Sequence, residues 1–175
     1  MSRKEQNIRG IKMCDEENVR AKYAKITDLL LEKGKWITTM ESCTSGMIAS
    51  LLTDREGSSG CIKGAFVTYS NEAKVKIGVP QETIERYGVY SSETAMEMAR
   101  TCRSEYQADI GIGVTGTFGN TDPNNIDSVP GEVFFAIDQA EGTNYYHCKV
   151  PVQPSRHAYK IYMADAIADV LLELL

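Results

Sequence analysis

The sequence predicts an α/β fold, a three-layer α/β/α sandwich around a mixed central sheet. Helical and strand patterns alternate along most of the 175 residues, as in chains that form a sheet covered by helices on both faces. Near the C-terminus two strand patterns follow each other with only a polar turn between them, which adds an antiparallel hairpin. The length suits one domain with a single core, and no internal repeat or linker divides it.

The chain begins with a polar stretch, residues 1–14, which has mixed charge and no hydrophobic period. We therefore expect a flexible N-terminal arm and then one domain over residues 15–175. The first helix is predicted from Asp15 to Lys33, with Gly34 as its stop. Its apolar residues recur at steps of four and three, which predicts one buried face made of Val19, Tyr23, Ile26 and Leu30.

Residues 36–52 predict a strand, a sharp turn and a helix. The first part is β-branched and aromatic, whereas Met47–Leu52 has apolar residues three and four positions apart. Such a turn presents free backbone N–H groups and the positive end of a helix dipole, which suits an anion or a developing oxyanion. A nucleophile could use that field, and the candidates are Ser42, Cys43, Thr44 and Ser45. Ordinary helix capping by Thr44 or Ser45 accounts for the same residues equally well.

One strand and three helices are expected between residues 54 and 106. In order, the chain should form a loop over 54–60, a strand over 65–69, a short helix from 71 to about 78, a second over 81–87 and a longer helix over about 93–106. Pro80 suits the first turn of its helix, and Ser91 or Ser92 suits the cap of the longer one.

The C-terminal part should supply three more strands and a last helix. The strands are expected at 109–114, 131–138 and 144–152, the last two joined by a turn near Glu141 and Gly142. The polar loop after residue 114 contains two prolines and is long for a small domain, which favours a functional role. Ser155 should cap the last helix, whose apolar face consists of Ile161, Ala164, Ile167, Leu171 and Leu174.

Ligands of such sheets collect beyond the C-terminal ends of the parallel strands. Three loops with site-like composition would lie there: Glu41–Gly46, Tyr69–Lys74 and Thr115–Gly119. The chain has only two histidines, both displaced from these loops, so a Ser-His-Asp triad is poorly supported.

A lysine base is the remaining option for activating a serine, because a desolvated amine has a lowered pKa. Lys74 is the best-placed lysine, and Tyr69 could relay or orient the proton. Lys74 could instead lie on a solvated helix face together with Lys76. Tyr69 could simply be an aromatic residue at the end of a strand. Arg156 is a candidate for phosphate recognition or else a surface arginine. Thr115 and Gly116 could approach a ligand closely or form a simple turn.

Composition excludes several classes of function. Asp and Glu total 24 against 19 Lys and Arg, so a nucleic-acid-binding surface is not expected, although a local pocket can still bind a small anion. No apolar run is long enough for a membrane span and no signal peptide is evident, so we expect a cytoplasmic protein without membrane contact. The five cysteines are widely spaced and odd in number, which argues against zinc sites and disulfides. Nothing supports a bound dinucleotide, ATP or metal.

Four segments together resemble a known family, the CinA C-terminal domain family. They are residues 39–46 (Thr-Met-Glu-Ser-Cys-Thr-Ser-Gly), 57–59 (Gly-Ser-Ser), 66–74 (Phe-Val-Thr-Tyr-Ser-Asn-Glu-Ala-Lys) and 114–116 (Val-Thr-Gly). The likeness keeps the order of these motifs and runs from about residue 15 to the C-terminus. The family's larger N-terminal domain is missing, so the chain looks like the stand-alone form.

This resemblance implies a CinA C-terminal domain-like fold and hydrolysis of nicotinamide mononucleotide to nicotinate mononucleotide and ammonia, in pyridine nucleotide salvage. It implies Ser42 as nucleophile with Lys74 and Tyr69 as partners, and no cofactor or metal. Substrate contacts would come from Cys43, Thr44, Ser45, Gly46, Asn71, Thr115, Gly116 and Arg156. Members of the family commonly self-associate, so a homo-oligomer is expected.

Three departures from the family pattern bear on function. Ser45 replaces a usual glycine, and a left-handed backbone there would strain the turn. The usual Gly-Ile-Ala-Gly-Pro loop is replaced by residues 115–123, which bring a Phe and an Asp that could alter ligand fit. The Gly-Asp-Arg before the last helix reads Pro154-Ser155-Arg156. The alternatives are therefore a non-catalytic nucleotide-binding or regulatory protein, and an amidohydrolase for a different small amide.

Overall fold

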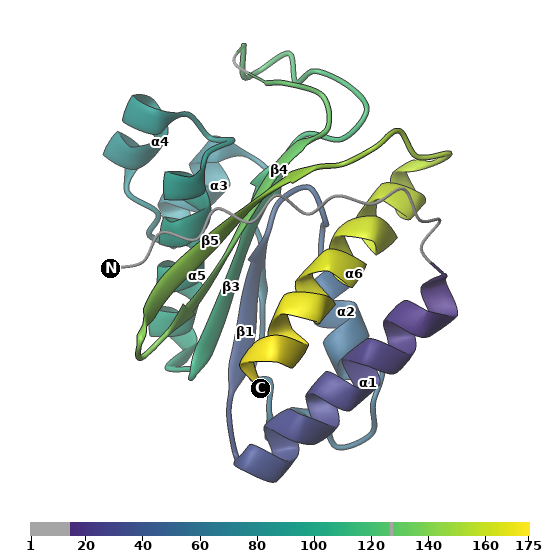
Figure 1. Ribbon diagram of the computed structural model, residues 1–175. Coiled ribbons are helices and arrows are strands. Elements are labelled where there is room, and N and C mark those ends of the chain that lie inside the picture. Colours follow the sequence, from purple (N-terminus) through teal and green to yellow (C-terminus); the bar gives the residue numbers. More distant parts are fainter. Residues whose placement is uncertain (1–14, 127) are drawn as a thin grey trace.

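The computed structural model describes residues 15–126 and 128–175, and the arm expected over residues 1–14 lies outside them. A five-stranded mixed sheet is flanked by helices on both faces (Figure 1), which confirms the predicted fold class. The strands are β1 (Ile37–Glu41), β2 (Phe66–Val67), β3 (Ile110–Gly116), β4 (Glu132–Gln139) and β5 (Gly142–Lys149). The helices are α1 (Glu16–Lys33), α2 (Met47–Thr53), the short 3-10 helix η1 (Ser58–Gly60), α3 (Asn71–Ile77), α4 (Gln81–Tyr87), α5 (Ser92–Tyr106) and α6 (Arg156–Leu174).

The order of the strands is β2-β1-β3-β4-β5. β1 runs parallel to both β2 and β3, whereas β4 is antiparallel to β3 and to β5. The chain therefore places β2 on one side of β1 and β3 on the other. This change in direction of the strand order opens a crevice at the C-terminal ends of the parallel strands. β1 and β3 are buried along their whole length because both sheet faces are covered.

Helices α1, α2 and α6 cover one face of the sheet, and α5 covers the other with α4 packed against it (Figure 1). α5 approaches β3 very closely, because Gly111 and Gly113 carry no side chain at the crossing. A Cβ at either glycine would collide with the backbone carbonyl of Ala99 or Ala95. The glycines of β3 thus set how near α5 lies to the strand.

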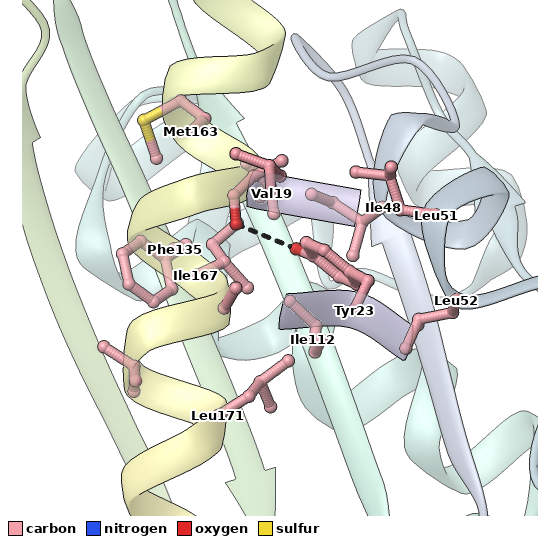
Figure 2. Packing of buried hydrophobic residues seen from close by; sticks show 14 of the residues in the cluster. Val19, Tyr23, Ile48, Leu51, Leu52, Ile112, Phe135, Met163, Ile167 and Leu171 are labelled. Atoms are coloured by element: carbon pink, nitrogen blue, oxygen red, sulfur yellow. Dashed lines mark hydrogen bonds between the residues drawn. The ribbon is translucent and has the colours of Figure 1, made fainter. Parts of the chain in front are cut away.

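The larger hydrophobic core lies between the sheet and the helices α1, α2 and α6. Figure 2 shows Tyr23 of α1 in this core, where its hydroxyl donates to the carbonyl of Ala164 on α6 at 3.0 Å. This bond satisfies the one polar atom of a fully buried ring. The predicted apolar face of α1 is confirmed, since its four residues are all fully buried: Val19, Tyr23, Ile26 and Leu30.

Three strands differ in extent from expectation. The third was expected to end at residue 114, but β3 continues through Thr115 and Gly116, which pair with β4 instead of opening the loop. The second strand was expected over residues 65–69, but β2 pairs over Phe66–Val67 alone and on one side only, against β1. The fifth was expected at 144–152, but β5 starts at Gly142, which pairs with Gln139 across a two-residue turn. Among the described helices, none combines the length and the apolar character that crossing a membrane requires.

Candidate active site

Ser42 and Lys74 meet where β1 ends. Ser42 is the first residue after β1, and Lys74 lies in the short helix α3. The Lys74 Nζ donates to the Ser42 Oγ at 3.2 Å and to the carbonyl of Thr68 at 2.9 Å. The Lys74 side chain is 1% exposed, whereas Lys76 is exposed. The alternative prediction, that Lys74 lies on a solvated helix face together with Lys76, is therefore wrong.

Burial changes the acid–base character of the Lys74 amine. Desolvation lowers its pKa from an ordinary 10.5 to about 8, and the negative charges of Asp122 and Glu72 oppose that shift. The neutral form is consequently accessible near neutral pH. A neutral amine beside a hydroxyl is a competent general base.

Backbone hydrogen bonds hold the two side chains in this position. The Ser42 N–H donates to the carbonyl of Val114 on β3 at 3.0 Å, and the Thr68 N–H donates to the carbonyl of Glu41 at 2.9 Å. Ser70 then caps α3 by accepting the N–H of Ala73 at 3.1 Å. The serine and the start of α3 are thus both tied to the end of the central strand.

The N-terminus of α2 is capped by Glu41, a role that the sequence did not suggest. The fully buried Glu41 carboxylate accepts the N–H groups of Ile48 at 3.1 Å and Ala49 at 2.9 Å. Capping of this helix by Thr44 or Ser45 is therefore wrong: the Thr44 hydroxyl is buried without a partner in the described structure, and the residue before α2 is Gly46. The positive end of α2 is satisfied from within the protein.

The turn between Ser42 and α2 has a left-handed backbone at two successive residues. Ser45 has a φ of 51° and Gly46 a φ of 87°. Gly46 adopts this geometry without cost, whereas a residue with a Cβ is strained there. In the described structure the N–H groups of Cys43, Thr44 and Gly46 are not consumed by the hydrogen bonds of the turn. Of these three residues only Cys43 lines the cavity in front of Ser42, so its N–H is the one that an oxyanion there could reach.

Cys43 lies beside Ser42 but is poorly suited to be the nucleophile. Its thiol is buried, and burial together with the charge of Glu41 raises its pKa to about 12. The thiolate is the reactive form of cysteine, so Cys43 stays protonated at neutral pH.

A cavity of about 670 Å³ opens in front of Ser42. All three loops singled out in the sequence contribute to its wall, through Ser42 and Cys43, through Tyr69–Glu72 and through Gly116–Phe118. Much of the remaining wall is the connection between β3 and β4, which projects at the top of Figure 1.

Tyr69 lies at the rim of the cavity and not between Ser42 and Lys74, where a residue that relays the proton was expected. Its side chain is 60% exposed, and its hydroxyl accepts a hydrogen bond from the Arg156 Nη2 at 2.9 Å. The Arg156 guanidinium also lies 5.4 Å from the ring centre of Phe118. No hydrogen bond joins Tyr69 to Ser42 or Lys74 in the described structure, so the phenol is associated with the arginine instead.

Several residues expected to touch a substrate lie elsewhere or have other partners. Thr115 is fully buried, donates to the carbonyl of Val89 at 2.9 Å and is not part of the cavity wall. Thr44, Ser45 and Gly46 also lie outside the wall. Asn71 does line it, and its side-chain amide donates to the Asn125 Oδ1 at 2.9 Å.

Tyr90 and Asn125 belong to the cavity but were missed in the sequence. The Tyr90 hydroxyl and the Asn125 amide both donate to the Asp122 Oδ2 at 2.6 Å. Together with Asn71 they connect the loop after β3 to α3 and to the residues before α5. No sequence pattern marks Tyr90, since it lies in an ordinary turn before a helix cap. In the described part of the chain, no group of three or more His, Cys, Asp or Glu side chains could hold a metal ion.

The sequence matches the family described as the CinA C-terminal domain over residues 20–175. It is 47% identical over 95 residues to a CinA-like protein of Chlorobaculum tepidum, covering 54% of this chain and 22% of that protein. It is 36% identical over 152 residues to a putative competence-damage inducible protein of Clostridium kluyveri, covering 86% of this chain and 35% of that protein. The chain thus spans about a fifth to a third of the length of these relatives.

Solved structures of similar length share the fold. The crystal structure of a CinA superfamily protein from Escherichia coli has a TM-score of 0.82 at 26% identity and covers 94% of this chain and 95% of that one. The crystal structure of the competence/damage inducible protein CihA from Agrobacterium tumefaciens has a TM-score of 0.80 at 27% identity. The match covers 90% of this chain and 95% of that one. The sequence match extends over most of the chain, and the chain therefore belongs to the CinA C-terminal domain family.

Proposed function

We propose that the protein hydrolyses the carboxamide of nicotinamide mononucleotide to nicotinate mononucleotide and ammonia, the reaction that the family resemblance implies. The observation that carries the proposal is the buried amine of Lys74, 3.2 Å from the Ser42 hydroxyl at the wall of the cavity. A serine and a neutral lysine at this distance form the minimal pair for amide hydrolysis without histidine. The reaction places the chain in pyridine nucleotide salvage.

In the first half of the reaction, Ser42 Oγ attacks the carboxamide carbon while the Lys74 amine takes the hydroxyl proton. The carbonyl of Thr68 holds one N–H of this amine, which leaves its lone pair for Ser42. The tetrahedral oxyanion is stabilised by the N–H of Cys43, in the turn that follows Ser42. Lys74 then passes its proton to the amide nitrogen, the C–N bond breaks, and ammonia leaves an ester on Ser42.

In the second half, a water molecule attacks the ester carbonyl and gives its proton to the neutral Lys74. The C–O bond to Ser42 breaks, Lys74 returns the proton to the serine oxygen, and nicotinate mononucleotide departs. Arg156 is our candidate for the phosphate, because a guanidinium matches phosphate geometry. Its position at the cavity rim would separate the phosphate from the reacting carbon, so that binding energy orients the amide.

The proposal is tested by incubating the protein with nicotinamide mononucleotide and measuring ammonia in a coupled assay. We expect ammonia and nicotinate mononucleotide in equal amounts, and loss of both with Ser42→Ala. Ser50→Ala is the matched control, since Ser50 is an exposed serine of the neighbouring helix α2. The proposal fails if release does not exceed that of Ser42→Ala. Saturable nucleotide binding without turnover would then favour a regulatory protein.

A second candidate is hydrolysis of a different small carboxamide. It is favoured by the loop after β3, which supplies much of the cavity wall and differs from the Gly-rich loop usual in the family. A panel of carboxamides distinguishes the candidates. Turnover of another amide that exceeds turnover of nicotinamide mononucleotide, and that Lys74→Ala abolishes, would establish the second.

A further inference from the structure

The charges around the cavity are unevenly distributed. Asp122 and Glu72 bring carboxylates to its wall, and Arg156 brings a guanidinium. In the described structure Arg156 forms no ion pair with either carboxylate, and its hydrogen bond goes to Tyr69. A ligand that enters this cavity therefore meets negative and positive charge at separate places.

Asp122 is held as an oriented anion. Its Oδ2 accepts hydrogen bonds from the Tyr90 hydroxyl and the Asn125 amide, both at 2.6 Å, and its Oδ1 accepts the N–H of Asn124 at 2.9 Å. These bonds, that from Tyr90 foremost, lower the pKa of Asp122. A carboxylate oxygen can accept two hydrogen bonds, so Oδ1 keeps capacity for a ligand.

Hydrogen bonds also tie Asp122 to the helix that carries Lys74: the Asn125 amide donates to Asp122, and the Asn125 Oδ1 accepts from Asn71 at the start of α3. The charges of Asp122 and Lys74 interact, and each shifts the pKa of the other toward its charged form. A ring whose carboxamide is placed at Ser42 would therefore have Asp122 nearby. The ring of a pyridine nucleotide carries a full positive charge on its nitrogen, whereas most small amides are neutral.

We propose that Asp122 is a specificity-determining residue that favours carboxamides on a positively charged ring over neutral carboxamides of the same shape. This inference rests on the proposed function and names the ligand class of that site: a cationic N-substituted pyridine carboxamide whose phosphate lies toward Arg156. Attraction between the Asp122 carboxylate and the ring nitrogen supplies the preference. The residue is a feature of this chain's own loop, residues 115–123, rather than of the glycine-rich loop usual in the family.

The test compares two ligands in equilibrium binding to the protein carrying Ser42→Ala, so that no turnover intervenes. One ligand is nicotinamide mononucleotide, and the other is benzamide riboside 5′-monophosphate, which has carbon in place of the ring nitrogen and no ring charge. The measured quantity is the ratio of the two dissociation constants. We expect the charged ring to bind about fivefold more tightly, the discrimination expected of one partly exposed charge pair.

Adding Asp122→Asn should bring this ratio close to one, because asparagine keeps the shape and removes the charge. Tyr90→Phe is the matched control, since it removes a hydrogen bond to Asp122 but leaves the carboxylate. Tyr90→Phe should weaken the binding of both ligands by a similar factor and leave the ratio of their dissociation constants unchanged. Comparing the two variants separates the effect of the Asp122 charge on ligand preference from the effect of the Asp122 hydrogen bonds on the structure of the loop.

An unchanged ratio in Asp122→Asn, or a ratio near one before that change, overturns the inference even if the protein hydrolyses nicotinamide mononucleotide. A ratio that collapses on losing Asp122 supports it, even if turnover is absent and the proposed function fails. Binding of neither nucleotide overturns it as well. Should Asp122→Asn not fold, the salt dependence of the ratio decides: it should fall as ionic strength rises, and a constant ratio contradicts the role of charge.

Discussion

The Nζ of Lys74 donates a hydrogen bond to the Oγ of Ser42 at 3.2 Å, from a side chain that is 1% exposed. Burying a lysine is costly unless its amine is hydrogen-bonded or neutral. Here the carbonyl of Thr68 satisfies one N–H and the pKa falls to about 8. The fold thus keeps an amine in a place where a hydrophobic side chain would be easier to bury, which points to chemistry rather than to stability.

Replacing Lys74 with Met should abolish ammonia release while the protein remains folded. Methionine has a similar length but cannot accept a proton, so we expect kcat to fall by about 100-fold or more, the usual effect of losing a general base. Lys76→Met is the matched control, because Lys76 is an exposed lysine of the same helix α3. Its activity should equal that of the unmodified protein. Equal losses in the two variants would contradict the role of Lys74.

The pH dependence of kcat/KM should report the Lys74 amine. The group acts as a base only when neutral, and its pKa is lowered to about 8. Activity should therefore be constant above about pH 9 and fall about tenfold for each pH unit below about 7.5, since the protonated amine cannot accept the Ser42 proton. Steady-state rates between pH 5.5 and 9.5 measure this. A flat profile across that range would show that another group is the base.

The overall fold and the elements that position the site followed from periodicity. The spacing of apolar residues predicted α1 and α6, and the β-branched run before Ser42 predicted β1, because these elements are built from local patterns. The extent of β2 could not be predicted, since it depends on pairing with β1 alone. The meeting of Ser42 and Lys74 also depends on β1–β2 pairing, and for that reason sequence spacing alone favoured a surface position for Lys74.

The environment of the site was less predictable than its members. The cap of α2 comes from Glu41, which lies five residues before Gly46, a separation that lies outside local capping patterns. Tyr69 was expected to end its strand, but β2 stops at Val67, and the Tyr69 hydroxyl accepts a hydrogen bond from Arg156, which is 87 residues away in the chain. Such contacts arise from tertiary packing, and no motif in the sequence encodes them.

Replacing Ser45 with Gly should stabilise the protein. Ser45 has a φ of 51°, a conformation that costs a residue with a Cβ about 1–2 kcal/mol and glycine nothing. Part of this gain is offset by the greater freedom of glycine in the unfolded chain, so we expect about 0.5–1 kcal/mol in the free energy of unfolding by urea denaturation.

Ser50→Gly is the control for that experiment. Ser50 is an exposed residue within α2, where glycine should lower the free energy of unfolding by up to about 1 kcal/mol. The two changes to glycine, five positions apart, should thus have opposite signs. Destabilisation by both would mean that the weak 3.3 Å hydrogen bond from the Ser45 hydroxyl to the carbonyl of Ser42 outweighs the backbone strain.

Arg156→Ala should raise the KM for nicotinamide mononucleotide by about tenfold or more and change kcat little, because a phosphate contact far from the reacting carbon is equally strong in the ground state and the transition state. Nicotinamide riboside, which lacks the phosphate, should be used equally by both proteins. Tyr69→Phe removes the hydrogen bond that orients the guanidinium but leaves its charge, so it should raise the KM less. Steady-state kinetics with both substrates measure this. A lowered kcat with an unchanged KM in Tyr69→Phe would instead return Tyr69 to the proton path.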